Sequence, residues 1–207
     1  MYKTIAIVAT IFIGLLFCSC KNDTPKNNQI DSVKTVEGRE KVLDIIKEKI
    51  PPKYAKQSVD DTLATKIKSY ITAGFLTKND LKAIPENQRK FQFYKIDLNN
   101  DGKNEVFVNF LTSYFCGSGG CTLLLLDHKL AKINKFTATR TLFVEQTLQN
   151  NWRVILTESE GSWRKLVYIN GSYPSNPSMV KTTDEFPGDE SEILFQEGSS
   201  KLKTYTF

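Results

Sequence analysis

The stretch TLLLLD at residues 122–127 carries four consecutive leucines with no polar residue between them. Successive side chains of a strand point to opposite faces of the sheet, so an unbroken apolar run predicts a strand buried on both faces. A strand of this kind needs a neighbour on each side and a covering layer on each face. We therefore expect residues 122–127 to form a central strand.

Other short runs rich in β-branched and aromatic residues flank this stretch and predict further strands. These runs are FQFYKI (91–96), EVFVNFLTSY (105–114), TLFVEQ (141–146), WRVILT (152–157), WRKLVYI (163–169), SEILFQ (191–196) and LKTYTF (202–207). Connections such as Asn150-Asn151 and Glu160-Gly161-Ser162 are much shorter than the dozen residues that a parallel crossover needs. The pattern predicts a largely antiparallel sheet or meander over residues 87–207.

The sequence before residue 87 has helical periodicity instead. Apolar residues recur at helical spacing over 37–50, before Pro51-Pro52, and again over 60–74. Thr77 and Asp80 have the spacing of a capping box that opens a third, short helix. Helices followed by strands indicate an α+β fold rather than an alternating α/β fold. We expect a single domain over 37–207, with N-terminal helices (37–86) packed on a largely antiparallel β-rich part (87–207).

The composition is that of an ordinary globular protein. The chain has 207 residues, of which 40% are hydrophobic and 25% are charged. Its 28 basic and 23 acidic residues are interleaved, with a formal net charge of +5, so no basic block predicts a nucleic-acid partner.

Residues 1–19 have the form of an export signal. Lys3 precedes an apolar run from Ile5 to Phe17, which is shorter than the roughly 20 residues that a membrane-spanning helix needs. The run ends in LFCSC at 16–20, directly before the polar residues KND. The small residue Ser19 before Cys20 resembles the lipobox of bacterial lipoprotein precursors. An ordinary signal peptide with two incidental cysteines is the alternative.

The resemblance implies cleavage before Cys20, a diacylglycerol thioether on its sulfur and an acyl chain such as palmitate on its new amino group. Several acyl chains form a stable membrane anchor, whereas one chain does not. The polar composition of 20–36 predicts a flexible tether between this anchor and the domain. The domain is then expected in the bacterial cell envelope, outside the cytoplasm.

Two further cysteines, Cys116 and Cys121, enclose four small residues in CGSGGC. An exported protein reaches an oxidising compartment, where such a pair closes a small disulfide ring. We predict this disulfide, with Gly117, Gly119 and Gly120 available for positive φ angles. A redox-active pair or a metal site is the alternative, although redox pairs usually have two intervening residues and a metal needs more ligands.

The segment DLNNDGKNE at 97–105 has the spacing of the first nine positions of an EF-hand loop. The candidate calcium ligands are Asp97, Asn99, Asp101, the carbonyl of Lys103, and Glu105. The twelfth position is Val108 rather than a bidentate glutamate, so the segment is not an EF-hand. The alternative is a hairpin turn in which Asp and Asn side chains bind their own backbone. The sequence leaves both interpretations open.

Three segments resemble a group of uncharacterised exported bacterial proteins. They are DLNNDGKNEVFVNF, YFCGSGGCTLLLL, and GSWRKLVY followed by INGSYPSNPS, and together they cover about residues 91–178. The group carries an F-C-G-x-G-G-C-T segment, which is its distinctive part. The resemblance implies a shared fold and export, and it implies no activity.

Motifs of nucleophilic hydrolases, P-loops and zinc proteases do not occur in the sequence, and the single histidine, His128, cannot supply an imidazole-rich zinc site. Carboxylate pairs such as Glu158/Glu160 and Asp189/Glu190 are typical of solvated loops unless a cleft brings them together. The aromatic residues Trp152, Trp163, Tyr114 and Phe115 either fill the core or line a sugar- or peptide-binding face.

We expect a non-enzymatic envelope lipoprotein that binds an envelope protein or glycan. The expected binding surface is one end of the sheet, where the glycine-cysteine loop 116–121 and the acidic loop 97–105 would lie together. One alternative is a hydrolase of envelope polymers with an Asp/Glu acid-base pair. Another is an inhibitor that inserts the loop 116–121 into a foreign hydrolase.

Overall fold

The computed structural model describes residues 55–196 and 202–207, which belong to one compact unit spanning Ile50–Phe207. The predicted signal peptide (1–19), Cys20, the tether (20–36) and the predicted helix over 37–50 lie outside the described residues. They remain predictions.

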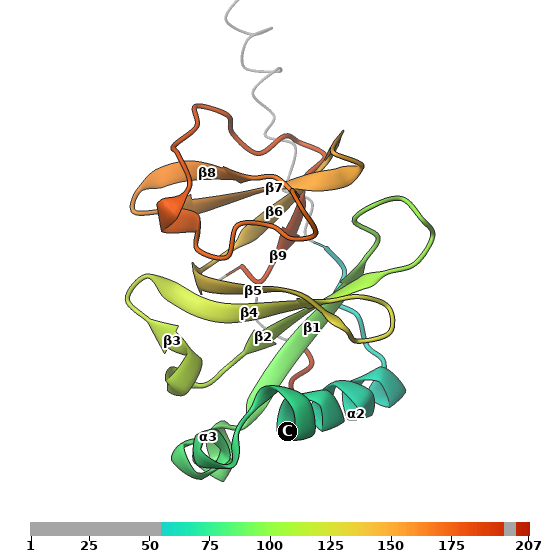
Figure 1. The fold of residues 1–207 in the computed structure, drawn as a ribbon, viewed down its shortest axis with the longest axis vertical. Coiled ribbons are helices and arrows are strands. Elements are labelled where there is room, and N and C mark those ends of the chain that lie inside the picture. The colour runs from blue at the N-terminus through green and yellow to red at the C-terminus, as the bar shows by residue number, and fades with distance from the viewer. Residues whose placement is uncertain (1–54, 197–201) are drawn as a thin grey trace, which may run out of the picture. The chain divides into compact units, whose positions relative to one another are not determined.

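The described residues are mostly antiparallel β-sheet with one short helical segment before it (Figure 1). Helix α2 (Asp61–Tyr70) continues into a π-helical turn, η1 (Ile71–Phe75), and a six-residue helix, α3 (Lys78–Ala83), follows. Single 3-10 turns occur at η2 (Glu86–Gln88), η3 (Ser113–Phe115) and η4 (Pro177–Met179).

Two antiparallel sheets contain all the strands of the described residues. The first sheet has the order β10-β1-β2-β4-β3, with β5 also paired to β4, and the second has the order β8-β7-β6-β9. The strands of the first sheet are β1 (Lys90–Ile96), β2 (Glu105–Phe110), β3 (Cys116–Gly117), β4 (Gly120–Leu126), β5 (Lys132–Thr139) and β10 (Tyr205–Thr206). Those of the second are β6 (Leu142–Gln149), β7 (Trp152–Ser159), β8 (Ser162–Leu166) and β9 (Glu192–Leu194).

The four leucines of β4 confirm the prediction of a central strand. Each of them is at most 1% exposed, and β4 has β5 along one edge and β2 along the other, with the short β3 beyond the end of β2. Leu123 and Leu125 face a core shared with the second sheet, whereas Leu124 and Leu126 face a core shared with α2 and η1. The first sheet is therefore covered on both faces, which explains why the leucine run of β4 contains no polar residue.

The helical prediction is supported only in part. Asp60 caps α2 by accepting a hydrogen bond from the Leu63 N–H (2.9 Å), and the capping box of Thr77 and Asp80 is confirmed. The expectation of an N-terminal part made of several helices is not supported, because residues 55–60 are not helical and α2 with η1 forms the only helix longer than two turns in the described residues. The fold lies between α+β and mainly β.

The predicted strands are present, although the run predicted over 105–114 is a strand only as far as Phe110 and then leads into η3. The two-residue β3 was not predicted, and neither was β5. Two buried positions of β5 are occupied by the polar residues Asn134 and Thr139. The sequence of β5 therefore lacks the alternation of apolar and polar residues that identifies a half-buried strand. The two predicted short connections are confirmed as tight hairpins, with φ values of 55° and 63° at Asn150 and Asn151 and of 54° and 70° at Glu160 and Gly161. These positive pairs match the twist of the strands that they join.

The two loops that we expected to lie together are at opposite ends of the first sheet. The acidic loop joins β1 to β2 where Ile96 pairs with Glu105, whereas the glycine-cysteine loop lies beyond the other end of β2, where Phe91 pairs with Phe110. One strand separates the two loops in the sequence, and a single antiparallel strand carries the chain from one end of a sheet to the other. This corrects the predicted location of the binding surface.

Candidate functional site

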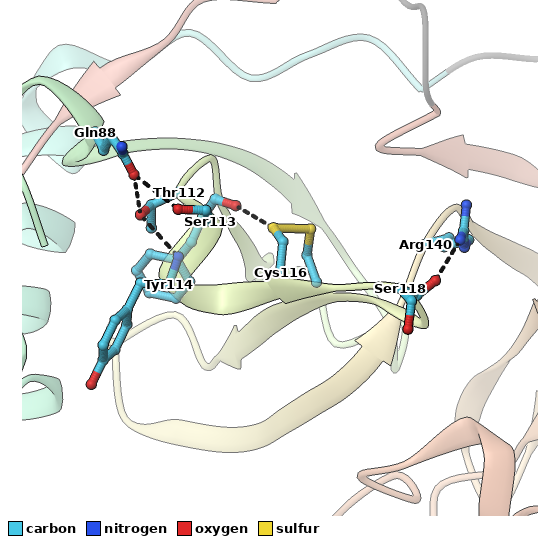
Figure 2. The surroundings of a disulfide bond; sticks show 9 residues. Gln88, Thr112, Ser113, Tyr114, Cys116, Ser118 and Arg140 are labelled. Carbon is cyan, nitrogen blue, oxygen red and sulfur yellow. Dashed lines mark hydrogen bonds between the residues drawn. A yellow bond between two sulfur atoms is a disulfide. The ribbon is translucent and has the colours of Figure 1, made fainter.

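The glycine-cysteine loop is a small hairpin closed by the predicted disulfide (Figure 2). Strand β3 pairs with the start of β4, so that Cys116 lies opposite Cys121 and Gly117 lies opposite Gly120. Directly opposed residues of an antiparallel pair bring their Cβ atoms close enough for a disulfide bond. The structure thus confirms the Cys116–Cys121 pair, and backbone pairing explains its position.

The tip of this hairpin packs against the end of β5. A Cβ atom on Gly120, which has φ +126°, would lie 2.6 Å from the carbonyl oxygen of Thr139. The Ser118 carbonyl accepts a hydrogen bond from Nη2 of Arg140 (2.7 Å), as Figure 2 shows. Of the three glycines available for positive φ, Gly120 adopts it and Gly117 and Gly119 do not. A Cβ atom on Gly119 would lie only 3.3 Å from the Cβ atom of Ala138, so a larger residue would crowd this position.

The segment that leads into the hairpin is also fixed. The Gln88 side-chain oxygen accepts hydrogen bonds from the hydroxyls of Thr112 (3.4 Å) and Ser113 (3.1 Å), as drawn in Figure 2. The Tyr114 hydroxyl donates to Oδ1 of Asp80 (2.5 Å), and this bond lowers the pKa of Asp80 and raises the pKa of Tyr114. The hairpin is therefore a preorganised element.

Three cavities meet at Arg140, in the link between β5 and β6. A cavity of about 540 Å³ lies between the hairpin tip and the β7–β8 turn, and a cavity of about 340 Å³ lies beside Trp163 on the second sheet. Both are lined by Arg140 and Glu158, and we call these two cavities together the Arg140 cleft. A third cavity of about 250 Å³ extends from Arg140 to Cys121 and Asn109.

Charges of both signs line the Arg140 cleft. Glu158 and Glu160 contribute carboxylates, and Glu160 lies 3.7 Å from Nη2 of the buried Arg164. Nη1 of Arg164 donates to the carbonyl of Val180 (2.6 Å), which holds this guanidinium in place behind the turn. The predicted carboxylate pair Glu158/Glu160 thus lies at one cavity.

Trp163 is the predicted aromatic residue that lines the cleft. Its ring lies 5.2 Å from the ring of Phe143 and 6.3 Å from the exposed ring of Phe186, in edge-to-face arrangements. Glu158 is its direct partner across β7 and β8. Trp152 lies instead near the acidic loop, stacked on Tyr168 at 3.9 Å and packed against the core.

The remaining predicted aromatic residues belong to a different cluster. Phe115 lies 4.4 Å from the buried Phe110, and Tyr114 lies 5.1 Å from Phe115. Phe115 packs against the core beside α2 and η1, and Tyr114 binds Asp80 of α3, so both support the segment that leads into the hairpin. None of the three cavities at Arg140 is lined by them.

The acidic loop uses its side chains to bind its own backbone. The Asp97 carboxylate accepts hydrogen bonds from the N–H groups of Asn99 (3.3 Å), Asp101 (3.3 Å) and Gly102 (2.9 Å). Asn99 accepts one from Asp101, and Asp101 accepts one from Lys103. This is the pattern expected for the hairpin-turn interpretation.

Glu105 is the buried member of the acidic loop, with only 3% of its surface exposed. Its Oε2 accepts a hydrogen bond from the N–H of Leu98 (2.8 Å). Burial raises the pKa of Glu105, and the nearby Asp101 and Asp97 add to the rise. The loop is tied to the second sheet, because the Arg153 N–H donates to the carbonyl of Leu98 (2.7 Å).

The metal interpretation remains a prediction. Among the residues that the structure describes, no group of three or more His, Cys, Asp or Glu side chains is arranged to hold a metal ion. His128 lies exposed in the turn between β4 and β5 and lines none of the three cavities at Arg140.

Sequence reasoning did not identify Arg140 as a site residue. Arg140 follows directly after β5, the strand that was also missed. In this strand a bulge shifts the pairing with β4 between Cys121 and Leu123, and Ala138 has φ 51°. The run KINKFTATR, with Ile133 and Phe136 spaced as in an interrupted strand, is the only signal in the sequence that could have placed Arg140 at a strand end.

Comparison with known proteins gives no matching family, no similar curated protein and no similar solved structure. Within 55–196 and 202–207, no helix is long and apolar enough to cross a membrane.

Proposed function

We propose that this protein is a lipid-anchored lipoprotein of the bacterial cell envelope that binds an envelope component without chemical turnover. The resemblance of Ser19-Cys20 to a lipobox supports the anchor. The Cys116–Cys121 disulfide supports export, because disulfides persist in oxidising compartments.

The observation that carries the binding role is the Arg140 cleft. Charged, hydroxyl and aromatic side chains from separate parts of the chain converge there on two cavities that share Arg140 and Glu158. The hairpin that forms one wall is held by a disulfide, by close packing on β5 and by the bond from Arg140 to Ser118. A rigid wall loses little conformational freedom when a ligand binds.

The anchor is tested by mass spectrometry of the protein purified from its native host. We expect a chain that begins at Cys20 and carries the mass of a diacylglycerol thioether with or without an N-linked acyl chain. An intact N-terminus, or cleavage elsewhere without lipid, would contradict the envelope location and the role built on it.

The binding surface is tested by photo-crosslinking in intact host cells. A photoreactive amino acid at Ser178, which lines the cleft, is compared with one at Ile169, which is exposed in a turn near Tyr168 and Trp152. We expect a discrete crosslinked envelope species from position 178 only. Equal or no crosslinking at both positions would contradict a binding role for the cleft.

A hydrolase of envelope polymers is the second candidate, because Glu158 and Glu160 line the same cavity. Glycosidases need an acid and a second carboxylate across a cleft. The carboxyl group whose pKa burial raises, Glu105, does not line this cleft. Release of soluble fragments from purified envelope polymers, lost in Glu158→Gln, would establish the enzyme instead of the binding protein.

The inhibitor alternative receives no support from the geometry of the hairpin. An inhibitory loop must project far enough to enter a foreign active site. Here Ser118 and Gly120 lie against Arg140 and Thr139 of the same chain. Insertion of this tip would first require its separation from β5.

A further inference from the structure

We propose that the Arg140 cleft binds an uncharged oligosaccharide, with one pyranose ring against Trp163 and the next ring toward Ser118 and Ser178. The inference rests on the proposed binding function and names its ligand class. It follows from the side chains at the cleft, their charges, and the way that β8 is covered.

The part of the cleft beside Trp163 combines aromatic and planar polar side chains. Phe143 and Trp163 line it together with Arg140, Glu158 and Gln196. A pyranose presents apolar C–H groups on one face and hydroxyls around its edge. It can therefore pack on an indole ring while a carboxylate, an amide and a guanidinium bind its hydroxyls.

The charges favour an uncharged ligand. Arg140 and Glu158 line both cavities, so a ligand with a strong charge of either sign meets an unfavourable group in each. Glu160 lies near Arg164, which offsets part of its charge. Sugar hydroxyls both donate and accept hydrogen bonds, so they satisfy an arginine and a glutamate at the same time.

The second cavity provides space for at least one more sugar ring. It has a volume of about 540 Å³, and small residues line it, including Ser118, Gly119, Ser159 and Ser178. Because it shares Arg140 and Glu158 with the cavity at Trp163, a ligand can extend from one to the other. The hydroxyls of three serines suit a polar chain better than an apolar one.

A peptide strand is the less suitable ligand, because the edge of β8 near the cleft is already occupied. Arg164 forms a bridge with Thr182, and the Trp163 carbonyl accepts a hydrogen bond from the N–H of Thr183 (3.0 Å). Addition of a peptide strand requires a free edge with unpaired backbone groups. At β8 the segment 182–183 already occupies this edge.

The chain contains only two tryptophans, which permits a direct test. In the detergent-solubilised full chain, Trp152→Phe leaves Trp163 as the only reporter, at the cleft. Trp163→Phe leaves Trp152 as the only reporter, stacked on Tyr168 at the other end of β7. Maltotriose, cellotriose and N,N′,N″-triacetylchitotriose, three uncharged trisaccharides, are titrated into each variant to millimolar concentration while tryptophan emission is recorded.

We expect at least one trisaccharide to change the emission of the Trp152→Phe variant saturably and to leave the Trp163→Phe variant unchanged. In the Trp152→Phe background, Glu158→Ala should weaken this binding about tenfold, as expected for one charge-assisted hydrogen bond. Glu158 is exposed, so this substitution leaves the fold intact.

The inference is overturned if none of the three sugars changes the emission of Trp163, if Trp152 responds equally, or if Glu158→Ala binds as tightly as its parent. A crosslinked protein at Ser178 together with no sugar response would overturn the oligosaccharide while the proposed binding function stands. Loss of crosslinking at position 178 would contradict the binding function itself.

Discussion

At the β1–β2 end of the first sheet, the carboxylates of Asp97 and Asp101 accept hydrogen bonds from the backbone of their own loop. At the other end, Arg140, Glu158 and Glu160 line cavities. Both ends are rich in polar residues. The first end forms a turn and the second forms a cleft, because at the second the hairpin, the β5–β6 link, the β7–β8 turn and η4 all line one cavity.

This difference shows which polar residues are available to a ligand. A compact motif such as DLNNDG brings its oxygens together within one loop, and the same proximity lets backbone N–H groups bind them. The polar residues of the cleft come from distant parts of the sequence, so no local backbone group satisfies them all. Each end can be tested by substitutions that remove its defining contacts.

The largest effect is expected from Gly120→Ala at the cleft end. The added Cβ would lie 2.6 to 2.8 Å from three backbone atoms of Thr139, and the residue has φ +126°. Because backbone cannot move aside as a side chain can, we expect the free energy of unfolding to fall by about 3 kcal/mol. Urea unfolding of the full chain measures the change.

Gly117→Ala is the matched control in the same hairpin. A Cβ at Gly117 would have nothing within 4 Å, and its φ is not positive. Its unfolding should shift by no more than about 0.5 kcal/mol. Equal effects of the two substitutions would show that the hairpin does not pack on β5 as described.

The second prediction concerns the disulfide. Replacing Cys116 and Cys121 together by serine should lower the free energy of unfolding by about 2 kcal/mol, because the ring that the bond closes is short. The effect should be smaller than that of Gly120→Ala, since β3 and β4 still pair. Unchanged thermal unfolding, together with free thiols at Cys116 and Cys121 in the unsubstituted protein, would contradict the bond.

Much of the fold could be predicted from the sequence, because it depends on local patterns. Four leucines in a row identified β4 as a strand covered on both faces, and Asn150-Asn151 identified a tight hairpin. The pairing of Cys116 with Cys121 was also local, since only four residues separate them. Patterns of this kind need no knowledge of distant contacts.

The cleft could not be predicted, because it depends on which ends of which strands come together. Arg140 is one of 28 basic residues, and no motif in the sequence distinguishes it from the others. Its importance comes from the bulge at Ala138 and from the second sheet, which brings Glu158 and Trp163 to it. The polar buried residues of β5 concealed the strand itself, and with it the point where the chain passes from one sheet to the other.

The third prediction addresses the acidic end. Asp97→Ala removes the acceptor of three backbone N–H groups, so we expect a loss of about 1 kcal/mol in the free energy of unfolding. The hairpin-turn interpretation requires the same loss in EDTA and in millimolar calcium. A calcium-dependent rise in the unfolding temperature of the parent, absent from the variant, would establish the calcium interpretation instead.

The smallest effect is expected from Glu105→Gln, and it depends on pH. Burial raises the pKa of Glu105, so the folded protein holds this proton at a pH where the unfolded chain has released it. In the unfolded chain Glu105 has the ordinary glutamate pKa of 4.5, and in the folded protein its pKa is higher. The free energy of unfolding of the parent therefore falls as the pH rises from the unfolded pKa through the folded pKa. Glutamine keeps an oxygen for the Leu98 N–H but carries no charge to bury.

The difference in unfolding free energy between Glu105→Gln and the parent should therefore move in favour of glutamine between about pH 4 and about pH 7. Asp60, Asp61 and Asp80 have lowered pKa values and give the opposite slope, but they are present in both proteins and cancel in the difference. Glu86→Gln, at a side chain that is 90% exposed, is the control for the charge change alone. A constant difference across this range would mean that the pKa of Glu105 is the same in the folded and the unfolded protein, so that the backbone N–H groups that lower it, such as that of Leu98, fully offset its burial.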